Sequence, residues 1–179
     1  MPVSPTNRYA HPWEFICVNT MYTATILFLT LERLKGDESF WKPYLDILPA
    51  RYDTTARWTE AELELFRDPY IKAKSLERLR EIEKDYLALM QALEGTGYDE
   101  ELNFDVFEWA WNTAATRCFF LPEVTECAMV PFADLLNHHS DSAVTWTVSE
   151  DGVFEMILGG SAPVQKGDQV YNNYASDDS

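Results

Sequence analysis

The sequence predicts an α+β protein in which a helical first two-thirds is followed by a β-rich last third. Up to about residue 120, apolar residues recur at the 3.6-residue spacing of amphipathic helices. After Leu121-Pro122 the apolar runs become short and alternate with polar residues, as in half-buried strands. We therefore divide the chain into an irregular N-terminus (1–13), a helical region (14–120) and a β region (121–179).

Composition and charge exclude several classes of protein. Fourteen basic against thirty acidic residues give a net charge of −16, which repels nucleic-acid phosphates, so a protein partner is expected instead. The aromatic content of 14% argues against disorder. The three cysteines lack CxxC spacing, which predicts neither a disulfide framework nor a thiolate zinc site and favours an intracellular compartment, cytoplasmic or nuclear. The apolar segment 15–31 is too short and too often interrupted to span a membrane.

The helical region should contain several helices with recognisable ends. A buried helix over 14–34 is expected to end at Lys35-Gly36, where glycine serves as the C-cap. A short helix over 40–49 is stopped by proline, and its aromatic residues are expected in the core. Thr59 and Glu62 have the spacing of a capping box. Two longer helices are expected to follow, over 69–93 and 104–120.

The β region should contain three strands. Alternation over 143–149, a turn signal at Glu150-Asp-Gly152 and a second apolar run over 153–158 predict a hairpin. A further short strand is expected over 169–174.

A cluster of polar residues follows an apolar run just before this hairpin. Asp134, Asn137 and His138 are three and four positions apart, so a single helical turn would bring all three to one face and form a binding site. No nucleophile elbow surrounds the nearby serines. His138 and His139 are adjacent and point apart, so no metal site is expected.

The segments Pro-Phe-Ala-Asp-Leu-Leu-Asn-His (131–138) and Lys-Gly-Asp-Gln-Val-Tyr-Asn-Asn-Tyr (166–174) resemble the second half of a SET domain, in the branch of the Rubisco large-subunit methyltransferase. Upstream, segment 39–49, Trp58 with its acidic helix and segment 115–119 resemble the helical insertion of that branch. The resemblance covers most of residues 20 to 174. It makes 14–120 an insertion-like (I-SET) region and 121–179 a partial SET β region.

The resemblance implies S-adenosylmethionine-dependent methylation of a protein side chain, usually the lysine ε-amine of a non-histone protein. By position, Asn137 and His138 would hold the adenine end of the cofactor through main-chain polar groups. Arg117 would lie near its carboxylate end, with Asp134 as a supporting contact. Tyr174 matches the tyrosine at the methyl-transfer centre.

The resemblance also implies an apolar channel for the substrate amine, with Phe119 in its wall. A polar residue at that position is associated with histidine-methylating members, so Phe119 favours lysine. Burial in such a channel lowers the pKa of a lysine and helps it to lose its proton before it attacks.

Two expected parts of a SET domain have no counterpart in this sequence. These are the glycine-rich first β segment and the segment that follows the tyrosine, where Ala175 replaces the usual glycine. The expectation is a SET domain truncated at both ends, with unpaired strand edges prone to association and with the activity of the isolated chain in doubt. Two alternatives stay open: a non-catalytic SET-derived interaction module and a plain helical scaffold.

Overall fold

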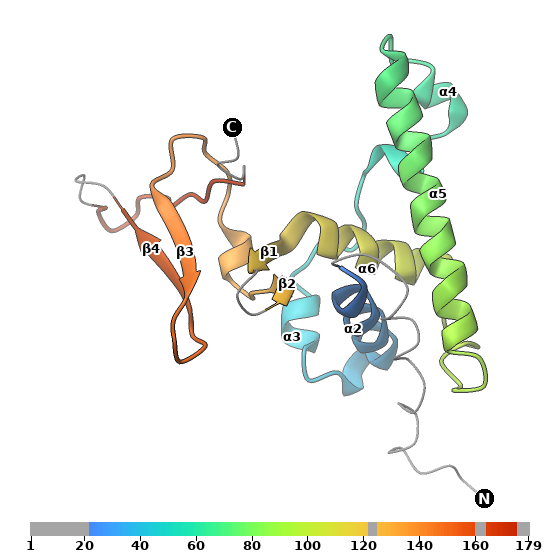
Figure 1. Cartoon of the computed structure of the whole chain (residues 1–179), viewed down its shortest axis with the longest axis horizontal. Coiled ribbons are helices and arrows are strands. Elements are labelled where there is room, and N and C mark those ends of the chain that lie inside the picture. The colour runs from blue at the N-terminus through green and yellow to red at the C-terminus, as the bar shows by residue number, and fades with distance from the viewer. Residues whose placement is uncertain (1–21, 122–124, 160–163, 175–179) are drawn as a thin grey trace, which may run out of the picture. The chain divides into compact units, whose positions relative to one another are not determined.

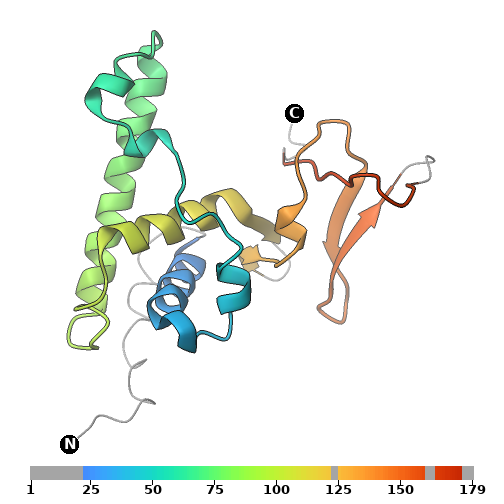
Figure 2. The same cartoon turned by 180° about the vertical axis from the view of Figure 1, so that it is seen from behind.

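In the computed structural model, residues 22–121, 125–159 and 164–174 are described. The chain divides into two compact units, a helical unit (Met1–Thr116) and a β unit (Arg117–Ser179). Figures 1 and 2 show the helices of the first unit and the short strands of the second from opposite sides. This mixture of helices and small antiparallel sheets confirms the α+β class. The predicted irregular segment 1–13 and the start of the first predicted helix lie outside the described residues.

The first helix described, α2 (Thr23–Lys35), ends as the sequence predicts. Gly36 follows it at φ 54°, in the region that favours glycine, and donates its backbone N–H to the Arg33 carbonyl. The short 3-10 helix η2 (Gly36–Glu38) and helix α3 (Lys42–Leu45) come next. The aromatic residues there are only partly in the core: Tyr44 is buried, whereas Phe40 is 86% exposed, so the core prediction is wrong for Phe40.

The next helices begin at the predicted caps. After the 3-10 helix η3 (Thr55–Arg57), α4 (Glu60–Leu63) starts with the capping box of Thr59 and Glu62, and both reciprocal hydrogen bonds are present. Helix α5 (Pro69–Ala92) starts at the N-cap Asp68, whose carboxylate accepts from the backbone N–H of Tyr70. The prediction of a long amphipathic helix over 69–93 is therefore confirmed.

The capping box should make the start of α4 sensitive to acid. The backbone N–H and then the hydroxyl of Thr59 hold the pKa of Glu62 below its ordinary value. A lowered folded-state pKa means that this stabilisation is present above the unfolded-state pKa and is lost as pH falls through the folded-state pKa. We expect wild type to lose more stability between about pH 7 and about pH 3 than Glu62→Gln, which keeps the cap without the titration. Urea unfolding at both pH values measures this, and equal losses would contradict it.

Helix α6 (Phe104–Arg117) buries a run of residues, from Phe107 to Ala114, in the core of the helical unit. Phe107 has no exposed surface, and its ring lies 5.7 Å from that of Tyr86 on α5. Phe104 contacts the same tyrosine edge-on at 5.4 Å, so these aromatic contacts join α5 to α6. The ribbons of these two helices are drawn in Figure 1. The guanidinium of Arg33 on α2 lies 3.9 Å from the ring centroid of Trp109, which joins α2 to α6.

The β unit contains two antiparallel hairpins. Strand β1 (Cys118–Leu121) pairs with β2 (Thr125–Met129), and β3 (Val144–Val148) pairs with β4 (Phe154–Leu158). The β3–β4 pair confirms the predicted hairpin. The predicted helix over 104–120 was wrong for its last three residues, which form β1: buried Phe119 and exposed Phe120 alternate in the period of a strand.

A disulfide joins Cys118 to Cys127 across the β1–β2 pair. The sequence predicted no disulfide framework, and for this one pair the prediction was wrong. The two Cα atoms lie 5.7 Å apart because the hairpin brings together residues nine apart in sequence, a proximity that CxxC spacing does not encode. Cys17 lies outside the described residues.

The predicted strand over 169–174 is wrong as a strand. In the described residues this segment forms a single parallel bridge, between Asn172 and His138. Because only one pair of residues is in register, no ladder develops. In the described part of the chain, we find no helix with the length and apolar character that a bilayer-spanning segment requires.

Candidate functional site

An ion pair lies at the point where α6 passes into β1. Arg117, the last residue of α6, directs its guanidinium Nη1 at the Asp134 carboxylate, 2.9 Å away, and also donates to the Asp134 main-chain carbonyl at 3.3 Å. The Asp134 side chain has no exposed surface, and that of Arg117 is 19% exposed. A buried carboxylate held by a guanidinium gives this part of the molecule a fixed arrangement of charge.

The turn that carries Asp134 is short. Phe132 precedes it at φ 72°, and the 3-10 helix η4 spans only Ala133–Leu135. Leu136 already has extended backbone, with ψ 130°. The expected helical turn that would align Asp134, Asn137 and His138 on one face is therefore wrong, because the chain becomes extended before it reaches Asn137.

Asn137 and His138 are positioned instead by the bridge to the C-terminal segment. The Asn172 backbone N–H donates to the Asn137 carbonyl at 2.8 Å, and the His139 N–H donates to the Asn172 carbonyl at 2.9 Å. The side chain of Asn172 is buried, and its amide oxygen has no hydrogen-bond partner among the described residues. Two segments far apart in sequence are thus held side by side.

Tyr174 lies beside His138. Its backbone N–H donates to His138 Nδ1 at 3.0 Å, and the two rings lie 5.2 Å apart. Because Nδ1 accepts this bond, the neutral imidazole carries its proton on Nε2. The Tyr174 hydroxyl donates to the Leu136 carbonyl at 2.5 Å, although the residue as a whole is 60% exposed.

Phe119 lies in the core of the β unit. It is 5% exposed, and its ring contacts Trp146 on β3 at 5.4 Å and Phe154 on β4 at 5.2 Å, both edge-on. These contacts anchor β1 to the second hairpin. Its place in the wall of a substrate channel stays a prediction.

The structure thus brings the predicted residues together in two pairs. Arg117 forms an ion pair with Asp134, and the backbone N–H of Tyr174 donates to His138. The Tyr174 hydroxyl also donates to the carbonyl of Leu136, in the extended chain that follows η4. Leu136 and Asn172 were not predicted as site residues from the sequence. Asn172 stands inside the segment 166–174, which was the available signal, but its contacts are with a segment more than thirty residues away.

Metal ligands are not gathered in the described residues: no group of three or more histidine, cysteine, aspartate or glutamate side chains there could hold an ion.

Comparison with known proteins gives several relatives. Human SET domain-containing protein 4 is 31% identical over 143 residues, which cover 72% of this chain and 32% of that protein. The chloroplastic [fructose-bisphosphate aldolase]-lysine N-methyltransferase of Arabidopsis thaliana is 28% identical over 163 residues, which cover 86% of this chain and 34% of the relative. No protein-family model matches the chain.

Solved structures give the same result. The SET domain of LSMT bound to lysine and AdoHcy matches with a TM-score of 0.75 at 26% identity, over 98% of this chain and 42% of that one. The structure of Rubisco LSMT bound to AdoMet matches with a TM-score of 0.70 at 27% identity. The chain spans about a third of the length of the curated relatives reported above.

Proposed function

Because the chain is a homologue of the SET-domain protein-lysine methyltransferases, including those like Rubisco LSMT, we propose that it takes part in S-adenosylmethionine-dependent methylation of a lysine in a non-histone protein. The observation that carries the proposal is the packing of Tyr174 on His138 beside the Asn172 bridge. The partner is a protein and not a nucleic acid, and the site of action is inside the cell, in the cytoplasm or nucleus. In this assignment residues 14–120 are the insertion-like (I-SET) region and 121–179 the SET β region.

His138 has main-chain groups suited to an adenine edge. Alternate residues of an extended chain point their N–H and carbonyl groups to opposite sides. The Asn137 carbonyl and the His139 N–H both face Asn172, so the N–H and carbonyl of His138 face the opposite side. These two groups of His138 make no main-chain hydrogen bond within the described residues. Adenine presents an N6 donor beside an N7 acceptor, which matches a carbonyl and an N–H on one edge.

Arg117 is suited to the carboxylate end of the cofactor. A guanidinium binds a carboxylate through charge-assisted hydrogen bonds. The ion pair with Asp134 already fixes the direction of the Arg117 guanidinium, so the side chain loses little conformational entropy when the cofactor binds. Asp134 therefore serves as a positioning residue. When bound, S-adenosylmethionine supplies the electrophilic methyl group.

Tyr174 is suited to orient the attacking amine. Its hydroxyl proton is donated to the Leu136 carbonyl, which leaves the oxygen lone pairs free to accept from an amine N–H. Methyl transfer needs a neutral amine and in-line placement of the reacting atoms, so orientation supplies most of the rate. Phe119 favours lysine over histidine, because histidine-methylating members of the family are associated with a polar residue at this position. An apolar wall would also lower the pKa of the lysine amine and help it to lose its proton.

Replacing Tyr174 by phenylalanine tests this function. We expect the rate of methyl incorporation into acceptor proteins to fall about 100-fold, because the amine loses its orienting oxygen. Binding of S-adenosylmethionine should change less than about threefold, since the substitution keeps the ring that lies against His138. Radiolabelled methyl incorporation into a cell lysate and isothermal titration calorimetry measure the two quantities.

Tyr171→Phe is the matched control, because Tyr171 belongs to the same segment and its ring lies against His139. It should leave methyl incorporation within about twofold. Unchanged incorporation by Tyr174→Phe would remove the assigned role of Tyr174. Failure of the wild-type chain to bind the cofactor at all would remove the proposed function.

A non-catalytic interaction module is the second candidate. The β3–β4 hairpin carries exposed apolar side chains, Val153, Ile157 and Leu158, which are suited to association through a strand edge. Partner capture in the absence of cofactor binding would favour this alternative.

A further inference from the structure

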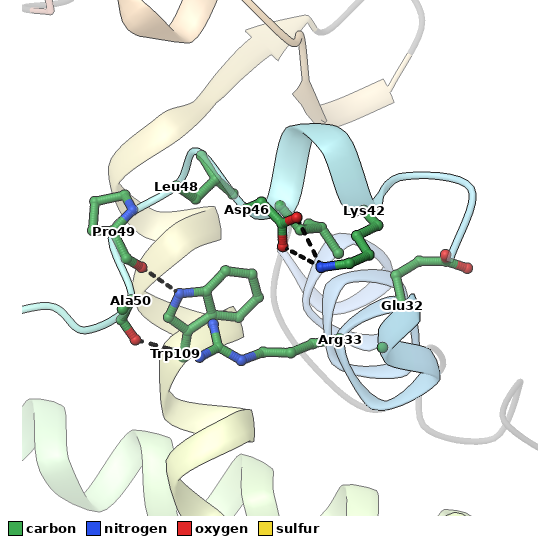
Figure 3. Close-up of a pocket in the computed structure, with 10 residues that line it drawn as sticks. Glu32, Arg33, Lys42, Asp46, Leu48, Pro49, Ala50 and Trp109 are labelled. Atoms are coloured by element: carbon green, nitrogen blue, oxygen red, sulfur yellow. Dashed lines mark hydrogen bonds and ion pairs between the residues drawn. The ribbon is translucent and has the colours of Figure 1, made fainter. Parts of the chain in front are cut away.

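Two small cavities of the helical unit share one contact in their linings, the guanidinium of Arg33 stacked on Trp109. The first cavity, of about 300 Å³, lies between α2, α3 and α6 (Figure 3). Its charged residues satisfy one another: Lys42 pairs with Asp46, and Glu32 pairs with Lys35 and Ser39. Apart from Arg33, which lines both cavities, this cavity has no unmatched charge to offer a ligand.

The second cavity, of about 250 Å³, has a different electrostatic character. Three arginines line it, Arg33, Arg51 and Arg57, in a chain whose net charge is −16. Arg57 forms ion pairs with Asp105, at 3.0 Å, and with Glu108. These two carboxylates are therefore neutralised in part, and the three arginines retain one surplus positive charge against them.

Arg33 is a half-buried cation with few partners. The only hydrogen bond of its guanidinium among the described residues goes to the Ala50 carbonyl at 3.3 Å, and it forms no ion pair there. A guanidinium has five N–H donors, so most of its capacity is unused. Burial lowers the pKa of Arg33, which is the mark of a cation that lacks a compensating anion.

The walls of the cavity are already ordered. The Trp109 indole N–H donates to the Pro49 carbonyl at 2.7 Å, which fixes the ring on which Arg33 lies (Figure 3). Arg51, by contrast, is exposed, and its charge opposes the rise that burial causes in the pKa of Glu108. A fixed cation beside an exposed one gives an anion two positive contacts, of which only the exposed side chain has to be ordered on binding.

We propose that this arginine cavity binds a carboxylate side chain of an acidic protein segment. One surplus positive charge matches a monoanionic carboxylate, whereas a phosphate dianion would face Asp105 and Glu108 without enough compensation. The volume lies below the range of pockets that enclose whole small molecules, which favours a single side chain. The proposal does not rest on methyl transfer, and its test needs no cofactor.

The test is a titration of the 179-residue chain with a hexaglutamate peptide, acetylated and amidated, at about 0.15 M salt, where long-range repulsion is screened. The readout is the indole N–H signal of Trp109 in a nitrogen-correlated NMR spectrum, assigned with a Trp109→Phe variant. We expect saturable movement of this signal with hexaglutamate and none with hexaglutamine. Inorganic phosphate at equal concentration should not displace the peptide.

Arg51→Gln and Arg80→Gln form a matched pair, because both remove one exposed arginine and change the net charge equally. Arg51→Gln should weaken hexaglutamate binding about 10-fold, as expected for one charge-assisted hydrogen bond, and Arg80→Gln less than twofold. Equal weakening by both variants, a Trp109 signal that does not move at roughly 5 mM peptide, or tighter binding of phosphate would each overturn the proposal.

Discussion

Replacing Arg117 by glutamine is expected to destabilise the β unit by about 3 kcal/mol and to weaken S-adenosylmethionine binding about 100-fold. The stability loss follows from the Asp134 carboxylate, which is fully buried and loses its ion pair with Arg117. The loss of affinity follows from the proposed role of the guanidinium at the carboxylate end of the cofactor. Urea unfolding and isothermal titration calorimetry measure the two effects.

A second substitution separates these effects. Asp134→Asn in the Arg117→Gln background removes the buried charge, so it should restore part of the stability without restoring cofactor affinity. Trp146 is the one tryptophan of residues 117–179, and its fluorine NMR signal after fluorotryptophan labelling reports the unfolding of the β unit. If stability and affinity recovered together in the double variant, Arg117 would be a structural residue alone.

Phe107→Ala should destabilise the helical unit by about 4 kcal/mol, the cost of removing a large aromatic side chain from a closed core. Phe107 has no exposed surface and packs against Tyr86, which also contacts Phe104. Little in this arrangement can move to fill the space. Chemical unfolding followed by circular dichroism at 222 nm measures the loss.

Phe40→Ala is the control for this substitution. It removes an equal side chain from a position that is 86% exposed, so the free energy of unfolding should change by less than about 0.5 kcal/mol. A loss below about 1 kcal/mol for Phe107→Ala would mean that α5 and α6 are not joined as described.

The helices could be predicted from the sequence because their signals are local. The capping box of Thr59 and Glu62, the Pro69 start of α5 and Gly36 after α2 each encode a helix end within a few residues. The β3–β4 hairpin was predictable for the same reason, since its alternation and turn lie in one short stretch.

The errors arose where distant contacts decide the structure. Cys118 and Phe119 continue the helical spacing of the residues before them, yet pairing with β2 makes them a strand. The position of His138 depends on Asn172, so a helical turn inferred from residues 134–138 could not anticipate it. The exposure of Phe40 was also not predictable, because aromatic content does not reveal which side chain faces solvent.

The bridge between His138 and Asn172 also bears on how far the length of the chain between these two residues can change. It closes a loop of about thirty-four residues that contains the whole β3–β4 hairpin. Because the entropy of loop closure grows only with the logarithm of loop length, doubling this loop would cost only about 0.6 kcal/mol. The exposed hairpin turn at Gly152 should therefore accept an inserted peptide or reporter while the bridge at the site persists.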